Sequence, residues 1–210
     1  MSAVTQRRRA PRGQGRLLRE EIIAAAERLL IERGSEDAVS IRAIADAVGV
    51  TPPSIYLHFA DKDELFLAVC DARFDQLARL STEAAAEATG ALDEIRRRGE
   101  AYIRFGLDNP EQYRVLFLDS GDDAGGVGME EIAKWACLSD LIDAIRRAQE
   151  DGSVAGDDPF LVAIGLWAAV HGLVSLLITK PGMPWPPRDE LIDYVLTTAV
   201  TGLLPRPASD

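Results

Sequence analysis

The chain has 210 residues, of which 47% are hydrophobic and 27% charged, a composition typical of folded soluble proteins that argues against disorder. Its formal net charge of −11, taken alone, argues against a nucleic-acid partner, because nucleic acids favour basic surfaces. The distribution of charge changes that conclusion. Residues 1–19 contain six arginines and no acid, and residues 1–64 are neutral, so residues 65–210 carry all the net negative charge. The front of the chain can therefore meet phosphate.

Cysteine usage and hydropathy exclude several protein classes. The two cysteines, Cys70 and Cys137, are too few and too far apart for a disulfide framework or a zinc site, so we expect two buried thiols in a reducing compartment. The N-terminus lacks the apolar stretch of a secretory signal. Glycine, serine and histidine interrupt the longest apolar stretch, residues 160–178, which predicts a helix buried on most sides and no membrane span. The expected location is the cytoplasm.

The first 50 residues predict an arm followed by two helices. Residues 1–15 are basic, contain glycine and proline and show no apolar period, which predicts a flexible arm. Apolar residues from Leu17 to Arg33 recur at helical spacing, and Gly34 is the expected stop. Ser40 is expected to cap a second helix, which the glycine at position 49 ends.

A third and a fourth helix are predicted directly after that glycine. Thr51 is expected to cap the third helix, with Pro52 at its first position, where a missing N–H costs nothing. We expect this helix to run to about Phe59. Asp61 is expected to cap the fourth helix.

The rest of the chain is also predicted to be helical, and no segment shows the sustained alternation of a strand. The remaining predicted helices cover residues 91–107, 110–118, 129–150, 158–179 and 188–204. The sequence therefore predicts an all-α protein of about nine helices.

Residues 40–65 read SIRAIADAVGVTPPSIYLHFADKDEL, a pattern typical of a helix-turn-helix. In that motif a glycine-containing turn reverses the chain, and the second helix presents its first residues to the major groove. The spacing predicts a small core that holds the two helices, formed by Ala45, Val48, Val50 and Ile55. The exposed side of the second helix would carry hydroxyls and hydrogen-bonding rings suited to phosphates and base edges, from Thr51, Ser54, Tyr56 and His58.

This segment resembles the DNA-binding domain of the TetR family of bacterial repressors. The matching residues are Ile44, Ala45, Ala47, Gly49, Val50, Thr51, Ile55, Tyr56, His58, Phe59, Lys62 and Leu65. Pro53 departs from the family pattern, which often has glycine or alanine there, and this can alter base contacts near the helix start. After the arm at residues 1–15, the resemblance implies a DNA-binding domain over 16–62 and a helical ligand-binding and dimerisation domain over 63–210.

The resemblance also implies which residues contact DNA. They are Arg42, Thr51, Pro52, Ser54, Tyr56, His58 and Lys62. Two alternatives stay open: Tyr56 and His58 can instead close the domain surface, and Arg42 can be a solvated helix residue. The arginine arm either contacts the minor groove or phosphates or has no role.

In the C-terminal part, WAAVHGL at residues 167–173 and NPEQYRVLF at 109–117 resemble a TetR subgroup with a Trp-His-Gly signature. The resemblance implies that the last two helices form a homodimer interface, which would place two recognition helices one DNA turn apart on a palindromic operator. The alternative is that these apolar faces are buried within one subunit.

The resemblance further implies a small-molecule pocket between the middle helices. Candidate lining residues are Tyr102, Phe105, Tyr113, Phe117, Trp135, Trp167 and His171. Each can equally be a core residue, and His171 can bind a ligand or be a satisfied core histidine. The sequence does not identify the effector.

The functional prediction is a DNA-binding transcriptional repressor that a small molecule releases from its operator. The alternative is a regulator of the same fold that is controlled by a protein partner or acts without a ligand. An enzyme is not expected, because the chain has only two histidines and shows no plausible nucleophile–base pair, no clustered metal ligands and no nucleotide-binding loop. We therefore expect no catalytic residue, metal or cofactor.

Overall fold

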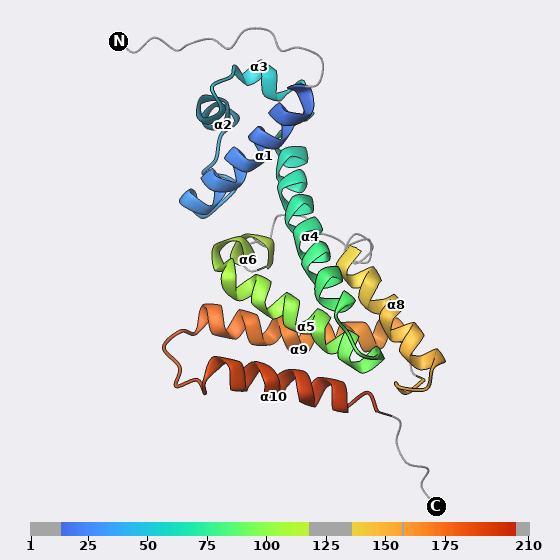
Figure 1. The fold of residues 1–210 in the computed structure, drawn as a ribbon. Helices are drawn as coiled ribbons and strands as arrows, with labels where there is room; N and C mark the ends of the chain where they lie inside the picture. The colour runs from blue at the N-terminus through green and yellow to red at the C-terminus, as the bar shows by residue number, and fades with distance from the viewer. Residues whose placement is uncertain (1–13, 118–135, 157, 205–210) are drawn as a thin grey trace, which may run out of the picture. The chain divides into compact units, whose positions relative to one another are not determined.

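The computed structural model describes residues 14–117, 136–156 and 158–204. Every regular element in these ranges is an α-helix (Figure 1), which confirms the all-α prediction. The nine helices of the described ranges are α1 (Gln14–Arg33), α2 (Ile41–Val48), α3 (Pro52–Ile55), α4 (Lys62–Ala86), α5 (Ala91–Asp108), α6 (Pro110–Phe117), α8 (Ala136–Glu150), α9 (Pro159–Thr179) and α10 (Arg188–Thr201).

The predicted boundaries of α1 and α3 differ from the structure. Helix α1 begins at Gln14, inside the predicted arm, whose residues 1–13 lie outside the described part of the chain. Helix α3 ends at Ile55 and not near Phe59. The N–H groups of His58 and Phe59 both donate to the Ile55 carbonyl, at 2.9 and 3.1 Å, so the chain continues to turn beyond the end of the regular helix. The predicted start of the helix at 129–150 also falls outside the described residues.

The chain divides into two compact units within α4. The N-terminal unit comprises residues 1–73 with 111–121, and the C-terminal unit comprises 74–110 with 122–210. We predicted the division at residue 62, where α4 begins. That domain boundary stays a prediction, and the first turns of α4 bury Leu65, Phe66 and Val69 in the N-terminal core.

The N-terminal core is built where α1, α2, α3 and the start of α4 meet. Ala45 and Ile55 are fully buried in it, and Val48 and Val50 pack against it half-buried, which confirms the predicted core of the helix-turn-helix. A largely buried ion pair between Glu27 on α1 and Arg73 on α4 adds a polar tie to this apolar cluster. Such a pair is expensive to break on one side only, because the remaining charge stays buried.

The C-terminal unit packs α5, α8, α9 and α10 together around a second apolar cluster. Helices α5 and α10 approach closely at Gly99, where a Cβ would lie 2.8 Å from Leu196 Cδ2. The thiols of Cys70 and Cys137 are free and half-buried rather than fully buried. Their burial raises the pKa of each to about 11, so both are protonated at neutral pH.

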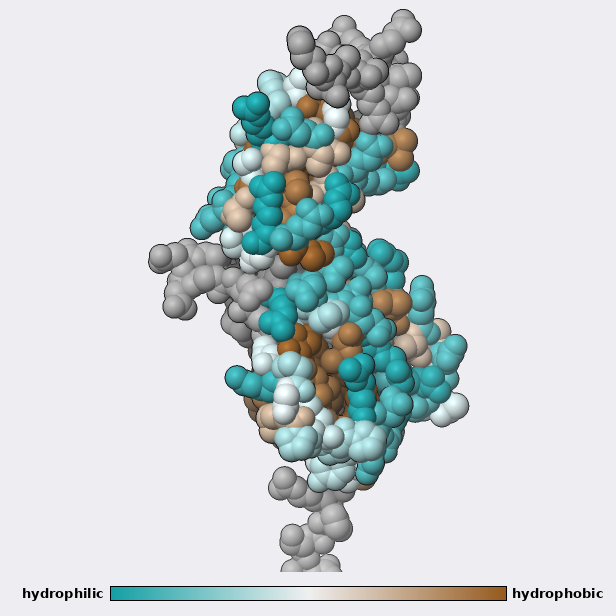
Figure 2. Space-filling view, turned by 90° about the vertical axis from the view of Figure 1, so that its left-hand side faces the viewer, coloured by the Kyte–Doolittle hydropathy of each residue, from teal (hydrophilic) through white to brown (hydrophobic). Residues whose placement is uncertain are grey.

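Helix α9 is much less buried than we predicted. By length and composition it is the one helix of the described ranges that could span a membrane, yet only 33% of its most apolar window is buried. The prediction of burial on most sides is therefore wrong for the single chain. The face of the molecule in Figure 2 is mainly hydrophilic with separate apolar patches.

Candidate functional site

Hydrogen bonds cap α2 at both ends, and those at its C-terminal end fix the turn to α3. Ser40 Oγ accepts from the Ala43 N–H at 3.2 Å, which confirms its predicted capping role. Gly49 adopts φ 79°, the left-handed conformation that glycine reaches without steric cost. The N–H groups of Gly49 and Val50 both donate to the Ala45 carbonyl at 2.9 Å. These contacts set the direction in which α3 leaves the turn.

Helix α3 is a single turn, and its start differs in one detail from the prediction. Pro52 occupies the first position as predicted, but Thr51 makes no side-chain capping bond to the backbone. Its hydroxyl lies 3.0 Å from the hydroxyl of Ser54 instead, and the Ser54 N–H donates to the Thr51 carbonyl at 2.8 Å. The two hydroxyls thus form a pair on the outside of the helix start, where they can hydrogen-bond to phosphate or base edges.

The side chains around the end of α3 separate sharply into buried and exposed. Ile55 and Phe59 are 0% and 1% exposed, whereas Tyr56 is 53% and Leu57 83% exposed. Sequence reasoning included Tyr56 among the DNA-facing residues and passed over Leu57. The signal was present, because Leu57 stands two residues from each of the two buried anchors and so points away from the core.

The start of α4 carries the predicted lysine on a well-capped helix. Asp61 Oδ1 accepts from the Glu64 N–H at 2.8 Å, and Glu64 Oε2 accepts from the Ala60 N–H at 2.5 Å, an arrangement close to a capping box. This confirms Asp61 as the cap. Lys62 is half-buried, with its ammonium 5.6 Å from the centre of the Phe66 ring. The ring and the cap together orient the lysine at the helix N-terminus, a favourable place for an anion.

All seven predicted DNA contacts therefore lie in the N-terminal unit, between residues 42 and 62. Arg42, Thr51 and Tyr56 are exposed, and Pro52, Ser54, His58 and Lys62 are half-buried. The arrangement offers a guanidinium, an ammonium, three hydroxyls and an imidazole, which are groups that bind phosphates and base edges. That these seven contact DNA stays a prediction.

A hydrogen-bonded cluster lies within the C-terminal unit. The Trp167 Nε1–H donates to the Tyr102 hydroxyl at 3.1 Å, and that hydroxyl lies 3.0 Å from His171 Nδ1. Since the indole can only donate, the Tyr102 oxygen accepts from it, and the tautomer of His171 decides whether Nδ1 accepts from that hydroxyl or donates to it. Trp167 and His171 also contact each other as predicted for residues four apart, with ring centroids 5.3 Å apart.

The burial of His171 favours the neutral form of its ring. Desolvation by burial lowers the pKa of His171 below its usual value, because the charged imidazolium loses water. The neutral ring hydrogen-bonds to Tyr102 through Nδ1 in either tautomer, as acceptor or as donor. Tyr102, Trp167 and His171 thus form a polar cluster in an otherwise apolar setting, a combination that small-molecule sites use.

The structure does not gather the other pocket candidates into this cluster. Tyr113 and Phe117 contact each other on α6, in the N-terminal unit, with ring centroids 4.8 Å apart, and Trp135 lies outside the described residues. Phe105 is buried on α5 and lines a surface groove of about 400 Å³. Predicting these positions needed the tertiary packing, which sequence spacing does not supply.

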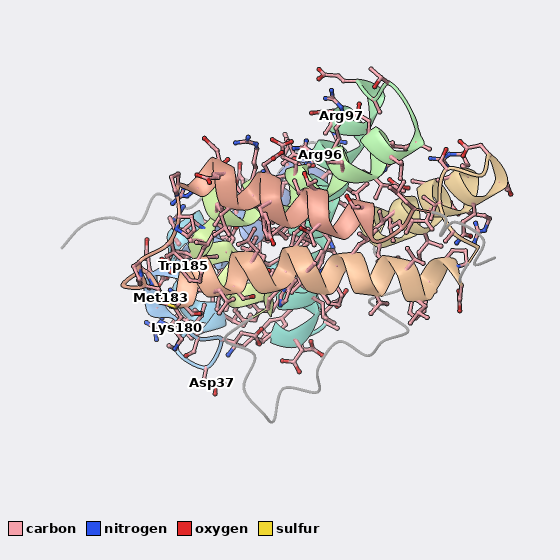
Figure 3. The ribbon with its side chains drawn as sticks, turned by 90° about the horizontal axis from the view of Figure 1, so that it is seen from below. Asp37, Arg96, Arg97, Lys180, Met183 and Trp185 are labelled. Atoms are coloured by element: carbon pink, nitrogen blue, oxygen red, sulfur yellow. The ribbon has the colours of Figure 1, made fainter. Side chains whose placement is uncertain are left out.

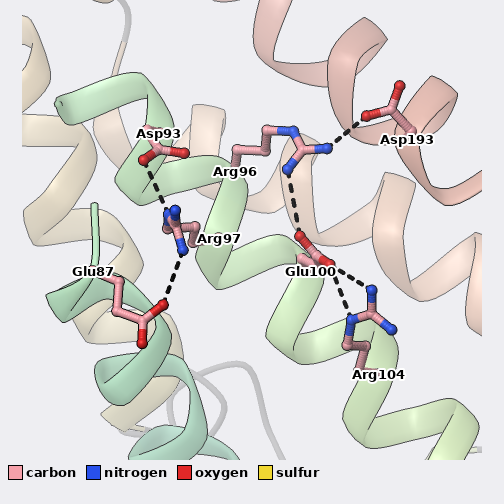
Figure 4. Close-up of polar contacts among 7 residues, drawn as sticks. All are labelled: Glu87, Asp93, Arg96, Arg97, Glu100, Arg104 and Asp193. Atoms are coloured by element: carbon pink, nitrogen blue, oxygen red, sulfur yellow. Dashed lines mark hydrogen bonds and ion pairs between the residues drawn. The ribbon is translucent and has the colours of Figure 1, made fainter. Parts of the chain in front are cut away.

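That groove is open and rich in ion pairs. Arg97 Nε donates to Asp93 at 3.0 Å, and Arg97 Nη1 lies 3.4 Å from Glu87. Arg104 is held by Glu100 at 2.7 Å (Figure 4). Because carboxylates of the same chain engage these guanidinium groups, the groove has little capacity to bind an anion.

Sequence families match both parts of the chain. The family described as "Bacterial regulatory proteins, tetR family" matches residues 22–69, and the "Tetracyclin repressor-like, C-terminal domain" matches residues 95–199. Neither match tests the resemblance to the Trp-His-Gly subgroup, which stays a prediction. A curated relative, the HTH-type transcriptional activator FasR of Mycolicibacterium smegmatis, is 29% identical over 71% of this chain and 67% of its own length.

Solved structures show the same fold. A protein of unknown function from Rhodococcus sp. RHA1 has a TM-score of 0.75 and 25% identity, over 90% of this chain and 96% of its own. A TetR family transcription regulator from Marinobacter aquaeolei VT8 has a TM-score of 0.73 and 21% identity, over 93% and 100%. FadR from Bacillus subtilis, in complex with stearoyl-CoA, has a TM-score of 0.74 and 18% identity, over 88% and 98%.

The lowered pKa of His171 predicts a specific pH dependence of stability. The unfolded chain takes up a proton at this residue near pH 6.5, and the folded chain only at lower pH, so protonation favours unfolding as the pH falls below about 6.5. We expect the free energy of unfolding of the wild type to fall relative to that of His171→Asn between about pH 7.5 and 5.5. Urea titrations at each pH measure both free energies. A difference between wild type and variant that does not change with pH would contradict the lowered pKa of His171.

Proposed function

Because this chain belongs to the TetR family of bacterial transcriptional regulators, we propose that it represses transcription by binding a palindromic operator as a homodimer, and that a small-molecule effector releases it. The observation that carries the proposal is the outward display of Tyr56 and the Thr51–Ser54 hydroxyl pair on a turn whose Ile55 and Phe59 are fully buried. Because these polar groups are already held in place, binding DNA would cost little conformational entropy for ordering them. We further propose that the protein acts in the cytoplasm, where its operator lies.

The chemistry of the exposed surface supports DNA as the partner. Arg42 and Lys62 can neutralise phosphates, and Tyr56 can donate a hydrogen bond to one. The remainder of the chain is acidic, so attraction to DNA has to come from this local surface. Few phosphate contacts per subunit give weak binding to a half-site, which makes a dimer physically useful.

The uncovered face of α9 supports the dimer. One stripe of this helix, with members three to four positions apart, consists of the exposed Leu161, Gly165, Ala168, Leu176 and Thr179 and the half-buried Gly172. A Cβ at Gly165 or at Gly172 would meet no atom of the chain within 4 Å, so packing within one subunit gives these glycines no purpose. A helix of a second copy can approach closely at these glycines, because they have no side chain. Figure 3 shows α9 and α10 side by side at the front of the view from below, as a four-helix interface with a second copy requires.

The polar cluster of Tyr102, Trp167 and His171 supports a small-molecule effector bound in the C-terminal unit. These three side chains satisfy one another, and an effector with a hydrogen-bonding group can replace one of the bonds and shift the packing of α5 against α9. The fold is shared with FadR, which was solved with stearoyl-CoA, so long-chain acyl-CoA is a rational first probe. The alternative is a regulator controlled by a protein partner or acting without a ligand.

The DNA-binding surface is tested with a duplex selected from a random library by the wild-type protein. We expect Tyr56→Ala to weaken binding to it about tenfold, and Lys62→Ala to lower the slope of log affinity against log salt by about one per half-site. Lys180→Ala, an exposed lysine beyond the end of α9, is the matched control and should bind as the wild type. Unchanged affinity and slope in both variants, measured by fluorescence anisotropy, would exclude this surface.

The dimer is tested at a glycine that has room within its own subunit. Gly165→Leu should fold normally, since a side chain there meets nothing in the chain, and should lose the dimer because it blocks the second helix. Sedimentation velocity gives the mass of the particle, and circular dichroism checks the fold. Gly156→Leu, which also has open space around it, should remain dimeric. A dimeric Gly165→Leu would refute the proposed interface.

The effector is tested by thermal shift and by release from the selected duplex. Stearoyl-CoA should raise the melting temperature as its concentration rises and lower DNA affinity, and Tyr102→Phe should alter both responses by removing the hydroxyl at the centre of the cluster. Free coenzyme A and stearate are the matched compounds. If acyl-CoAs and further metabolites leave melting and DNA binding unchanged, the regulator without a small ligand is the better description.

A further inference from the structure

Leu57 is the most exposed large hydrophobic side chain in the described part of the chain, at 83%. Single exposed leucines are common on protein surfaces, so exposure alone assigns no role. Its position suggests a role, because Leu57 lies between the buried Ile55 and Phe59 in the recognition turn, residues 51–59.

Leu57 contributes nothing to the fold of the N-terminal unit. The anchoring of the turn is provided by Ile55 and Phe59, which are fully buried on the opposite side. The hydrogen bonds from the His58 and Phe59 N–H groups to the Ile55 carbonyl, at 2.9 and 3.1 Å, keep the chain turning through Leu57. The leucine is thus held outward by a rigid backbone. Pro53, one helical turn earlier, is exposed as well, so the outermost ridge of the recognition segment is apolar.

The groups around this ridge are polar and can serve phosphates, but a leucine cannot hydrogen-bond to a phosphate or to a base edge. The apolar group that the major groove offers to an approaching side chain is the C5-methyl of thymine. Resting on the proposed DNA-binding function, we propose that Leu57 is a specificity-determining residue that recognises a thymine methyl group in each half of the operator. The leucine excludes water from that methyl group. A cytosine at the same position has no methyl group, so Leu57 would have no apolar partner there.

The contact has a defined size and a defined chemical probe. Replacing thymidine by deoxyuridine removes the methyl group and leaves the Watson–Crick pair and the hydrogen-bonding edge unchanged. Loss of one buried methyl group should weaken binding about fourfold at one half-site. Mutating Leu57 should cause a loss of similar size on the thymine duplex and abolish the effect of deoxyuridine, because both changes remove the same contact.

The experiment uses the full-length protein and the duplex selected by the wild type, with each thymine replaced in turn by deoxyuridine. We expect the wild type to lose about fourfold at one thymine position per half-site, and Leu57→Ala to bind the thymine and deoxyuridine forms of that position equally well. Leu67→Ala, an exposed leucine on α4, is the matched control and should keep the fourfold difference. Melting curves confirm that both variants are folded.

The outcomes separate the inference from the function on which it rests. If the random library yields no selected sequence, the proposed DNA-binding function fails. If a sequence is selected and no deoxyuridine substitution weakens the wild type, or if the effect persists undiminished in Leu57→Ala, the inference is overturned and the proposed function stands. Unchanged operator affinity in Leu57→Ala also overturns it, and would direct attention to a protein partner at this leucine.

Discussion

The burial of Ile55 and Phe59 is the constraint on which the DNA-facing surface depends. A helix of four residues has no stability of its own in water, because its nucleation cost is never recovered by propagation. Helix α3 therefore exists only because Ile55 and Phe59 are inserted between α1, α2 and α4. These two side chains fix the rotation of the segment about its axis. Tyr56 and Leu57 point outward as a direct consequence.

A largely buried ion pair also lies in the core of the N-terminal unit. Glu27 and Arg73 join α1 to α4, the two helices between which the anchors of the recognition turn are inserted. An apolar pair of similar volume would be no less stable, but an ion pair has a preferred geometry that apolar packing lacks. The pair therefore restricts how α1 and α4 can slide against each other, and with them the position of Ile55 and Phe59.

Sequence patterns predicted the local structure well and the tertiary structure poorly. The caps at Ser40 and Asp61 and the left-handed Gly49 follow from local chemistry, which a short window contains. The end of α3 at Ile55 does not follow from a short window, because no glycine or proline among residues 56–59 marks it. The bond between Tyr102 and His171 joins residues 69 apart in sequence, and no spacing rule relates them. For α9, hydropathy predicted burial on most sides, but only 33% of its most apolar window is buried within the chain, because hydropathy does not say which surface will cover an apolar face.

The net negative charge of the protein determines which DNA contacts can contribute most to sequence specificity. The arginines of α5 are engaged by carboxylates of the same chain, as Arg96 is by Asp193 at 2.6 Å (Figure 4), so the acidic C-terminal unit offers little to phosphate and repels it at long range. Phosphate contacts raise the affinity for every DNA sequence alike, and this repulsion lowers it for every sequence alike. An apolar contact such as that of Leu57 is insensitive to both, because it depends on the methyl group of one base. In an acidic regulator, contacts of this kind separate the operator from the rest of the genome most efficiently.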